Sequence, residues 1–383
     1  MSVTAPQGFR AAGVAAGLKS SGAPDVAMVV NDGPQDSAAA VFTTNRFPAA
    51  PVQWSRQVLT TGRLRAVVLN SGGANACTGA EGFQDTHATA EHTAAELGLG
   101  AIDVAAASTG LIGVRLPMDR LLPGVTDAAK ALAADGGPDA ARAIMTTDSV
   151  PKTTVVQRDG WSVGGMAKGA GMLAPSLATM LVVLTTDASV PADVLQAALE
   201  GATGVSLERV DSDGCLSTND TVIAMANGAA GVTPTAEEVA AALTEAATDL
   251  AMQLLADAEG STKDIAITVR NAASVADALT AGRACARNNL LKTALFGNDP
   301  NWGRVLAAIG TTDAAFEPDR VDVTINGVTV CRGGAIGDPR EGVDLTGRAI
   351  TIDVDLAAGT EQATIWTNDL SIAYVHENSA YST

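Results

Sequence analysis

The residues with the clearest chemical potential lie near the middle of the chain, where a glycine-rich segment ends and an apolar run begins. The segment Lys168–Gly171 leads through Pro175 to the run Thr179-Met180-Leu181-Val182-Val183-Leu184. This composition predicts a loop that delivers a threonine to the first position of a buried strand at Thr179–Thr185. A threonine hydroxyl needs a base to become a good nucleophile, and its own free α-amino group can be that base. Thr179 could work in this way only after the Ala178–Thr179 bond is cut.

Two other glycine-rich segments each follow a predicted strand. Asn70–Gly79 could present backbone amides to an anion, but it lacks the glycine and lysine spacings of phosphate loops and dinucleotide sites. In Ser108–Gly113, the Gly110 amide beside the Thr109 hydroxyl could supply two donors to a developing oxyanion. From the residues alone, a tight turn is the simpler interpretation of both segments, and a structural threonine is the simpler interpretation of Thr179. A third segment, Gly297–Arg304, is expected to be an ordered functional loop whose role the residues leave open.

Other catalytic arrangements are missing from the sequence. It has no Gly-x-Ser-x-Gly elbow and no His-Glu-x-x-His pair, and its three histidines offer little material for a serine–histidine triad. The spacing of the four cysteines argues against a disulfide framework or a zinc cluster: Cys77, Cys215, Cys285 and Cys331. We therefore expect no metal and no cofactor. An acyl-transfer enzyme built from this sequence would need another base, and an α-amino group with an unperturbed pKa of about 7.7–8.0 suits that role.

Composition sets broad limits on the class of protein. The chain has 383 residues, of which 47% are hydrophobic, enough for one large α/β unit or for two or three domains. The net charge of −18 argues against nucleic-acid partners and against docking on an anionic membrane. No secretory signal and no stretch of 18 uncharged apolar residues is visible, so we expect a soluble cytoplasmic protein that does not span a membrane.

The elements that must position these residues follow a layered α/β pattern, in which short apolar strands alternate with alanine-rich helices. Thr235 and Glu238 predict a capping box at the start of a helix that ends near Gly260, and Asn326-Gly327 predicts a hairpin turn. The stretch from Gly160 to Gly171 is expected to be an active-site loop. The predicted strands are Val26–Val30, Ala38–Thr43, Ala66–Asn70, Val104–Ser108, Thr179–Thr185, Thr221–Ala226, Asp264–Arg270, Val321–Ile325, Val328–Cys331, Ala349–Val354 and Ala363–Thr367.

Taken together, the motifs resemble the ornithine acetyltransferase family, the bifunctional glutamate/ornithine acetyltransferases of arginine biosynthesis. The resemblance covers essentially the full length of the chain. It includes Gly8–Val14, Ala40–Asn45, Asn70–Gly79, Ser108–Gly113, Thr146-Thr147-Asp148, Lys168–Leu181, Gly297–Arg304 and Glu377–Thr383.

The resemblance implies a self-processing enzyme with an N-terminal threonine nucleophile, folded as a four-layer α-β-β-α sandwich. Cleavage between Ala178 and Thr179 would give an α chain of residues 1–178 and a β chain of residues 179–383, assembled as an α2β2 tetramer. Thr179 would be the nucleophile, with Thr109 and Gly110 as the oxyanion hole. Substrate contacts would fall on Thr146, Lys168, Thr179, Glu259, Asn378 and Thr383, with Thr147 competing with Thr146.

The implied reaction moves an acetyl group from N2-acetylornithine to glutamate through an acetyl-threonine intermediate, in a ping-pong sequence without a cofactor. Whether acetyl-CoA is also a donor stays open. A cation such as Lys168 would pair with a substrate carboxylate, and Glu259 with the side-chain ammonium of ornithine. The alternative is an amide hydrolase or aminopeptidase of the same fold, in which water would take the acyl group.

Overall fold

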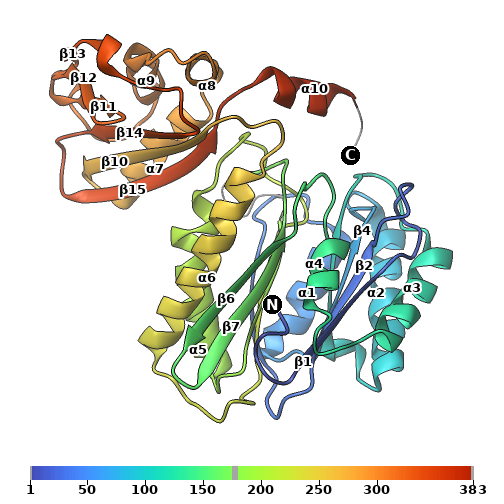
Figure 1. Cartoon of the computed structure of the whole chain (residues 1–383). Coiled ribbons are helices and arrows are strands. Elements are labelled where there is room, and N and C mark those ends of the chain that lie inside the picture. Colours follow the sequence, from blue (N-terminus) through green and yellow to red (C-terminus); the bar gives the residue numbers. More distant parts are fainter. Residues whose placement is uncertain (1, 175–179, 381–383) are drawn as a thin grey trace.

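The structure is a computed structural model that describes residues 2–174 and 180–380. Its strands form three sheets with helices packed against them, so the predicted α/β organisation is confirmed (Figure 1). Two sheets lie in the N-terminal two thirds of the chain, and the third forms a separate lobe from the C-terminal residues (Figure 1).

The first sheet has four strands in the order β1-β2-β4-β5. Strands β4 and β5 run parallel, whereas the other neighbours are antiparallel. Every residue of β2, β4 and β5 is buried, as expected for strands covered on both faces. The elements of this unit are β1 (Phe9–Val14), β2 (Val26–Asn31), β4 (Ala66–Ser71), β5 (Val104–Thr109), α1 (Ala50–Val58), α2 (Gly79–Leu97), α3 (Met118–Lys130) and α4 (Gly137–Ala143).

The second sheet has five strands in the order β3-β9-β8-β7-β6. Along β8, Leu181 and Val183 join the core of the first sheet, whereas Val182 and Leu184 join a core formed with α5 and α6. The period of two along a strand therefore gives this sheet two buried faces. The elements are β3 (Ser37–Phe42), β6 (Lys152–Arg158), β7 (Trp161–Lys168), β8 (Leu181–Thr186), β9 (Thr221–Ala226), α5 (Ala192–Val205) and α6 (Ala236–Ala256).

Helix α6 begins at the capping box that the sequence predicts. The Thr235 hydroxyl accepts a hydrogen bond from the Glu238 amide, and the Glu238 carboxylate accepts one from the Thr235 amide. Among the described residues, α6 alone is long and apolar enough to cross a membrane. Nine of its residues are buried in the core shared with α5 and the second sheet, which is typical of a core helix.

The third sheet has six strands in the order β13-β12-β11-β14-β10-β15 and encloses its own hydrophobic core. Asn326 and Gly327 both have positive φ, as the predicted hairpin between β11 and β12 requires. Helix α10 (Ile372–Ala380) leaves this lobe and extends toward the side of the molecule where the first sheet lies (Figure 1). The other elements are β10 (Asp264–Ala272), α7 (Val275–Ala286), α8 (Asn289–Phe296), α9 (Trp302–Ile309), β11 (Asp322–Ile325), β12 (Val328–Arg332), β13 (Ala335–Ile336), β14 (Ala349–Asp355) and β15 (Glu361–Asn368).

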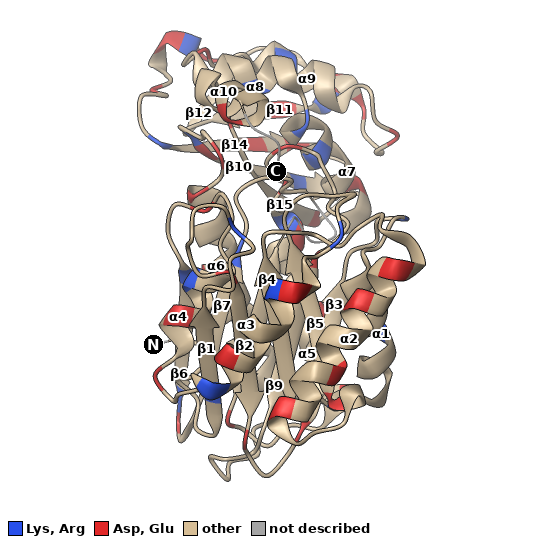
Figure 2. Ribbon diagram, turned by 90° about the vertical axis from the view of Figure 1, so that its right-hand side faces the viewer, with Lys and Arg blue, Asp and Glu red and all other residues tan. Residues whose placement is uncertain are grey.

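Many charged residues lie on the outer faces of helices. Figure 2 shows acidic residues along α2 and α3, in a chain that has 42 acidic and 24 basic residues. The lysines that matter most for the site, Lys152 and Lys168, are instead almost fully buried. The acidic exterior therefore encloses two buried lysines.

The structure corrects three expectations. The stretch from Gly160 to Gly171 is mostly the buried strand β7 and not a loop, because its glycines allow close packing: a Cβ at Gly164 would lie 2.3 Å from the Ser2 carbonyl oxygen. Helix α6 ends at Ala256, before the predicted end near Gly260. Strand β8 begins at Leu181, whereas Thr179 lies outside the described residues. Strands β1, β6 and β13 were not predicted, and the other predicted strands are confirmed within two residues at each end.

Candidate active site

A cavity of about 80 Å³ brings together most of the residues that the sequence singles out. Both Thr146 and Thr147 line it, so the choice between them stays open. Thr179 and Thr383 lie outside the described residues. The cavity is lined by Thr109, Gly110, Thr146, Thr147, Lys168, Gly171, Met172, Glu259 and Asn378.

The Thr109–Gly110 turn stands at the end of β5, where two glycine-rich segments meet. The amides of Gly72 and Gly73 both donate to the Thr109 carbonyl oxygen at 3.0 Å. Gly110 has φ 131°, and a Cβ there would lie 2.6 Å from the Gly73 nitrogen. Only glycine fits this close approach without strain. The Asn70–Gly79 segment therefore packs against the Thr109–Gly110 turn and holds its backbone in place.

Lys168 ends β7 and is only 2% exposed. Its Nζ donates a hydrogen bond to Thr109 Oγ1 at 3.3 Å. Burial lowers the pKa of Lys168, and the negative charge of Asp148 acts against this shift. A lysine held in this way presents its amino group to the cavity and donates to the residue expected to stabilise an oxyanion.

Asp148 connects the segments that surround the cavity. Its Oδ2 accepts from the Thr146 amide at 3.0 Å, and its Oδ1 accepts from the Gly169 amide and from Lys152 Nζ, both at 2.6 Å. Burial raises the pKa of Asp148, but the charges of Lys168 and Lys152 and the Gly169 amide outweigh it and lower that pKa to about 2. Asp148 is therefore an anion at neutral pH.

Glu259 reaches the cavity from the chain that follows α6. Its amide donates to the Ala170 carbonyl oxygen at 2.9 Å, which ties it to the segment after Lys168. A Cβ at Gly171 would lie 2.7 Å from Glu259 Oε1, so the glycine leaves room for the carboxylate. Lys168 and Glu259 thus place opposite charges in one small cavity.

Asn378 reaches the same cavity from the third lobe, as a residue of α10. The helix is fixed at its start, where the Ser371 hydroxyl donates to the Gly260 carbonyl oxygen and accepts from the Tyr374 amide. Gly260 has φ 60°, and a Cβ there would lie 2.2 Å from the Tyr374 nitrogen. The close packing that Gly260 permits therefore brings α10 beside Glu259.

Four polar residues near the cavity received no role from the sequence: Asp148, Lys152, Asn219 and Asp220. Asn219 Nδ2 donates to the carbonyl oxygens of Ala74 and Ser108, at 2.6 and 2.8 Å, and so joins both glycine-rich segments to the chain just before β9. Asp148 follows directly on Thr146-Thr147, a position that could have drawn attention to it. Asn219 and Asp220 meet partners that lie far away along the chain, and Lys152 meets both nearby Asp148 and distant Asp257.

Asp220 contacts Met180, the first described residue after the predicted cleavage junction in the sequence. Its Oδ1 accepts from the Met180 amide at 3.2 Å, and Met180 is the residue that follows Thr179. Its Oδ2 has no hydrogen-bond partner within residues 2–174 and 180–380. Burial raises the pKa of Asp220 well above its usual value, although the Met180 amide, the Ser217 side chain and the charge of Lys168 oppose the shift.

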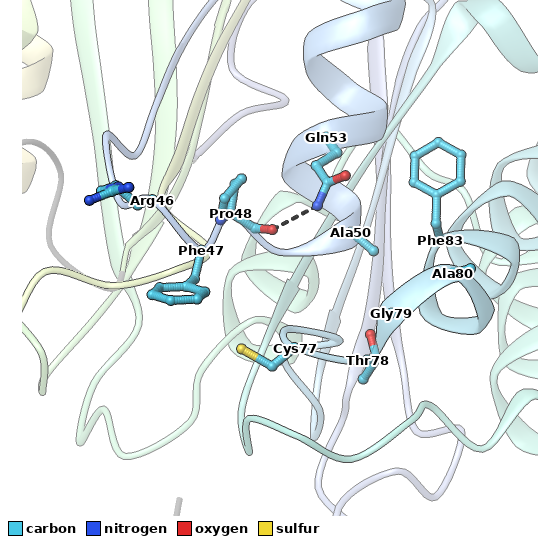
Figure 3. Close-up of a pocket in the computed structure, with 10 residues that line it drawn as sticks. All are labelled: Arg46, Phe47, Pro48, Ala50, Gln53, Cys77, Thr78, Gly79, Ala80 and Phe83. Carbon is cyan, nitrogen blue, oxygen red and sulfur yellow. Dashed lines mark hydrogen bonds between the residues drawn. The ribbon is translucent and has the colours of Figure 1, made fainter.

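A separate cavity of about 380 Å³ lies between the beginnings of α1 and α2. Figure 3 shows Phe47 and Phe83 on opposite sides of it, with the Gln53 side chain hydrogen-bonded to the Pro48 carbonyl oxygen. None of the residues expected to catalyse the reaction or to bind substrate lines this cavity, although Cys77, Thr78 and Gly79 of the Asn70–Gly79 segment do. The smaller cavity is therefore the candidate active site, because it collects most of the described residues expected to hold an oxyanion and to bind substrate.

The Gly297–Arg304 segment does not line either cavity. It joins α8 to α9 in the third lobe, where the Asn301 side chain accepts from the Arg304 amide and caps α9. Asn301 also donates to Asp299 at 2.9 Å. The dense polar residues of this segment thus have a structural use at a helix start.

The comparisons with known proteins agree with the motifs. The family model described as the ArgJ family matches residues 10–383. The "Arginine biosynthesis bifunctional protein ArgJ" of Streptomyces coelicolor is 64% identical and that of Thermobifida fusca 63% identical, each over 100% of both chains. A crystal structure of ornithine acetyltransferase complexed with ornithine, from Mycobacterium tuberculosis, is 61% identical. It covers 47% of this chain and 96% of that chain, with a TM-score of 0.45. The chain described here belongs to the ArgJ family.

Proposed function

We propose that this protein is a bifunctional acetyltransferase of arginine biosynthesis that transfers the acetyl group of N2-acetylornithine to glutamate. The names of its relatives support the pathway. The observation that carries the proposal is the cavity that unites the Thr109–Gly110 turn with Lys168 and Glu259. These groups offer oxyanion donors, a cation and an anion, which match an acetylated amino acid with an α-carboxylate and a side-chain ammonium.

The nucleophile in this proposal is Thr179, exposed by self-cleavage of the Ala178–Thr179 bond. Residues 1–178 and 179–383 then form the α and β chains of a four-layer α-β-β-α sandwich, which assembles as an α2β2 tetramer in the cytoplasm. The two buried faces of the second sheet support this layering, because α5 and α6 cover one face and the first sheet's core meets the other. The glycine-rich approach to Thr179 runs along the wall of the cavity through Gly171 and Met172.

The reaction proceeds in two half-reactions. The α-amine of Thr179 takes the proton of its own hydroxyl, whose oxygen attacks the acetyl carbonyl of N2-acetylornithine. Thr109 and Gly110 stabilise the resulting oxyanion, and the C–N bond breaks as the ornithine amine takes up a proton. Glutamate then attacks the acetyl-threonine ester through its amine, which restores the hydroxyl and releases N-acetylglutamate. One amide replaces another, so no activated donor and no cofactor are needed.

Substrate recognition rests on charge. Lys168 pairs with the α-carboxylate that ornithine and glutamate share, and Glu259 pairs with the ornithine ammonium. Thr146, Asn378 and Thr383 complete the polar contacts with substrate, and Thr147 is the alternative to Thr146 for the same contact. Lys168 suits this role because its ammonium is buried at the cavity wall and makes a hydrogen bond to a neutral hydroxyl. A charged hydrogen bond in such a place is stronger than one at the surface.

The test follows the acetyl group. Purified protein incubated with N2-acetylornithine labelled in the acetyl group, with and without glutamate, is analysed for N-acetylglutamate and free acetate. We expect N-acetylglutamate with little acetate. The alternative, an amide hydrolase or aminopeptidase, predicts acetate at the same rate with or without glutamate. Labelled acetyl-CoA in place of acetylornithine shows in the same assay whether it is a second donor.

A further inference from the structure

Two buried lysines compete for one buried carboxylate at the wall of the candidate active site. Lys152, at the start of β6, is 0% exposed, and Lys168, at the end of β7, is 2% exposed. The charges of both lysines act on Asp148, which lies between the Thr146 turn and the end of β7. Burying a lysine without a carboxylate partner costs free energy of folding. It therefore matters which of the two lysines pairs with Asp148.

In the structure, Lys152 forms the direct salt bridges with the nearby carboxylates. Its Nζ contacts Asp148 Oδ1 at 2.6 Å and Asp257 Oδ2 at 2.5 Å. Lys168 forms no salt bridge with any carboxylate of the described chain, and its hydrogen bond goes to the Thr109 hydroxyl. One lysine thus has two carboxylates, while the lysine that faces the cavity has none in direct contact.

Asp148 is also held in place by its other contacts. Its two oxygens accept the Gly169 and Thr146 amides in addition to the Lys152 ammonium. Asp257, directly after α6, also pairs with the Lys152 ammonium and accepts a hydrogen bond from the Ser149 amide at 3.0 Å. The Lys152 ammonium is therefore the centre of a buried network that spans β6, α6 and the turn carrying Thr146 and Thr147.

We propose that Lys152 is a positioning residue that keeps Asp148 from pairing with Lys168 and so leaves the Lys168 ammonium for the α-carboxylate of an amino-acid substrate. This inference rests on the proposed function, since it assigns Lys168 to that carboxylate. Lys152 itself does not line the cavity. It acts only through the charge that it supplies to Asp148.

The consequence of removing Lys152 follows from the cost of an uncompensated buried charge. Without the Lys152 ammonium, Asp148 keeps its two amide donors but loses its counter-ion. The remaining cation that acts most strongly on it is Lys168. A bond between Asp148 and Lys168 would neutralise the cation at the cavity wall, so a substrate carboxylate would find no free partner there.

The experiment compares two acetyl donors that differ only in the carboxylate. N-acetylputrescine has the acetamide and the ammonium of N2-acetylornithine but lacks the α-carboxylate. We expect Lys152→Met to lower the ratio of kcat/KM for N2-acetylornithine to that for N-acetylputrescine about tenfold or more, the usual effect of losing a charged hydrogen bond. The change should come mainly from KM for acetylornithine. Mass spectrometry of the same samples establishes that each variant is compared in the same cleavage state.

Two further variants separate positioning from general damage. Lys263→Met removes another buried lysine, whose Nζ donates to the carbonyl oxygens of Leu345 and Gly347 in the third lobe, and it should leave the ratio unchanged. Lys152→Gln keeps a donor for Asp148 without the charge and should lower the ratio as Lys152→Met does. An equal loss for both donors in the Lys152 variants would show that Lys152 only supports the fold and would overturn the inference.

A binding measurement distinguishes this inference from the proposed function. Calorimetric titration of the wild-type protein and the Lys152 variants with ornithine and with putrescine requires no turnover. If the wild type transfers no acetyl group, the proposed reaction is wrong, while a preference for ornithine that Lys152→Gln abolishes still supports the inference. If the wild type binds both diamines equally, or if the variants keep the full preference for ornithine, Lys152 does not reserve Lys168 for a carboxylate.

Discussion

The Lys168 ammonium donates a hydrogen bond to the hydroxyl of Thr109 across 3.3 Å, between the ends of two different sheets. The hydroxyl accepts from the ammonium, so its own proton stays available to a group in the cavity. A donor that is itself polarised by a cation donates more strongly. Binding of a carboxylate at Lys168 and stabilisation of an oxyanion at Thr109 are thus physically adjacent in the proposed mechanism.

The first prediction concerns the Thr109 hydroxyl. Thr109→Ala should lower kcat by roughly 10²–10³-fold, the usual effect of removing one oxyanion donor, with little effect on folding. Thr109→Ser keeps the hydroxyl and should retain most of the activity. Steady-state kinetics with N2-acetylornithine checks both variants. A loss confined to KM in Thr109→Ala would instead make Thr109 a binding residue.

The second prediction concerns self-cleavage. Purified wild-type protein should contain fragments of 178 and 205 residues, apart from removal of Met1, because Thr179 must become an N-terminus to gain its base. Thr179→Ala should remain one chain and be inactive, whereas Thr179→Ser should still be cleaved. Intact-mass spectrometry decides the matter, and fragments at this junction from protease-free Thr179→Ala would contradict the mechanism.

The third prediction concerns recognition of the ornithine ammonium. Glu259→Gln keeps the size and hydrogen-bonding capacity of the side chain but removes its charge. It should lower kcat/KM for N2-acetylornithine roughly ten- to hundredfold, as the loss of a charged hydrogen bond does. Self-cleavage should be unaffected because it involves no ornithine. An unchanged kcat/KM in the mature variant would mean that the carboxylate is only a solvated group after α6.

The fourth prediction concerns acid stability. The lysines around Asp148 lower its pKa from the ordinary 3.8 to about 2, so the folded state favours its anion. A depressed pKa of an acid stabilises the fold above the unfolded value, and this stabilisation is lost as the pH falls from about 4 to 2. Asp148→Asn should therefore lower the Tm at pH 7 and flatten the fall of Tm in acid. Thermal unfolding followed by circular dichroism between these pH values tests it, and parallel curves for the two proteins would refute it.

The fifth prediction concerns Asp220, whose pKa is shifted in the opposite direction from that of Asp148. Burial raises the pKa of Asp220, so its ionisation costs stability once the pH exceeds the unfolded value of 3.8. Asp220→Asn should raise the Tm near neutral pH, and the gain should vanish below that value. Asp187→Asn is a matched control at the other end of β8, because Asp187 is also buried but both its oxygens accept amides. A lower Tm for Asp220→Asn at neutral pH would show that its bond to the Met180 amide outweighs the cost of the charge.

Local patterns were enough to predict several elements and much of the cavity lining. The Thr235–Glu238 capping box, the Asn326-Gly327 turn and strand β9 depend on neighbouring residues, so the sequence indicates them directly. Family motifs predicted Thr109, Gly110, Lys168, Glu259 and Asn378, which the fold brings to one cavity. These positions follow from the family resemblance, because the residues alone favour structural interpretations, and their chemical roles are proposals.

Other features depend on contacts between distant residues. Strand β7 was expected to be a loop because of its glycines, and its burial became clear only from the Ser2 backbone that packs against Gly164. Asn219 holds Ser108 from 111 residues away, and Lys152 meets Asp257 from 105 residues away. No local pattern encodes such pairs. The sequence determined which ionisable groups the protein has, but only the tertiary structure decided which buried charges meet, because that depends on which groups folding places within a few ångströms of one another.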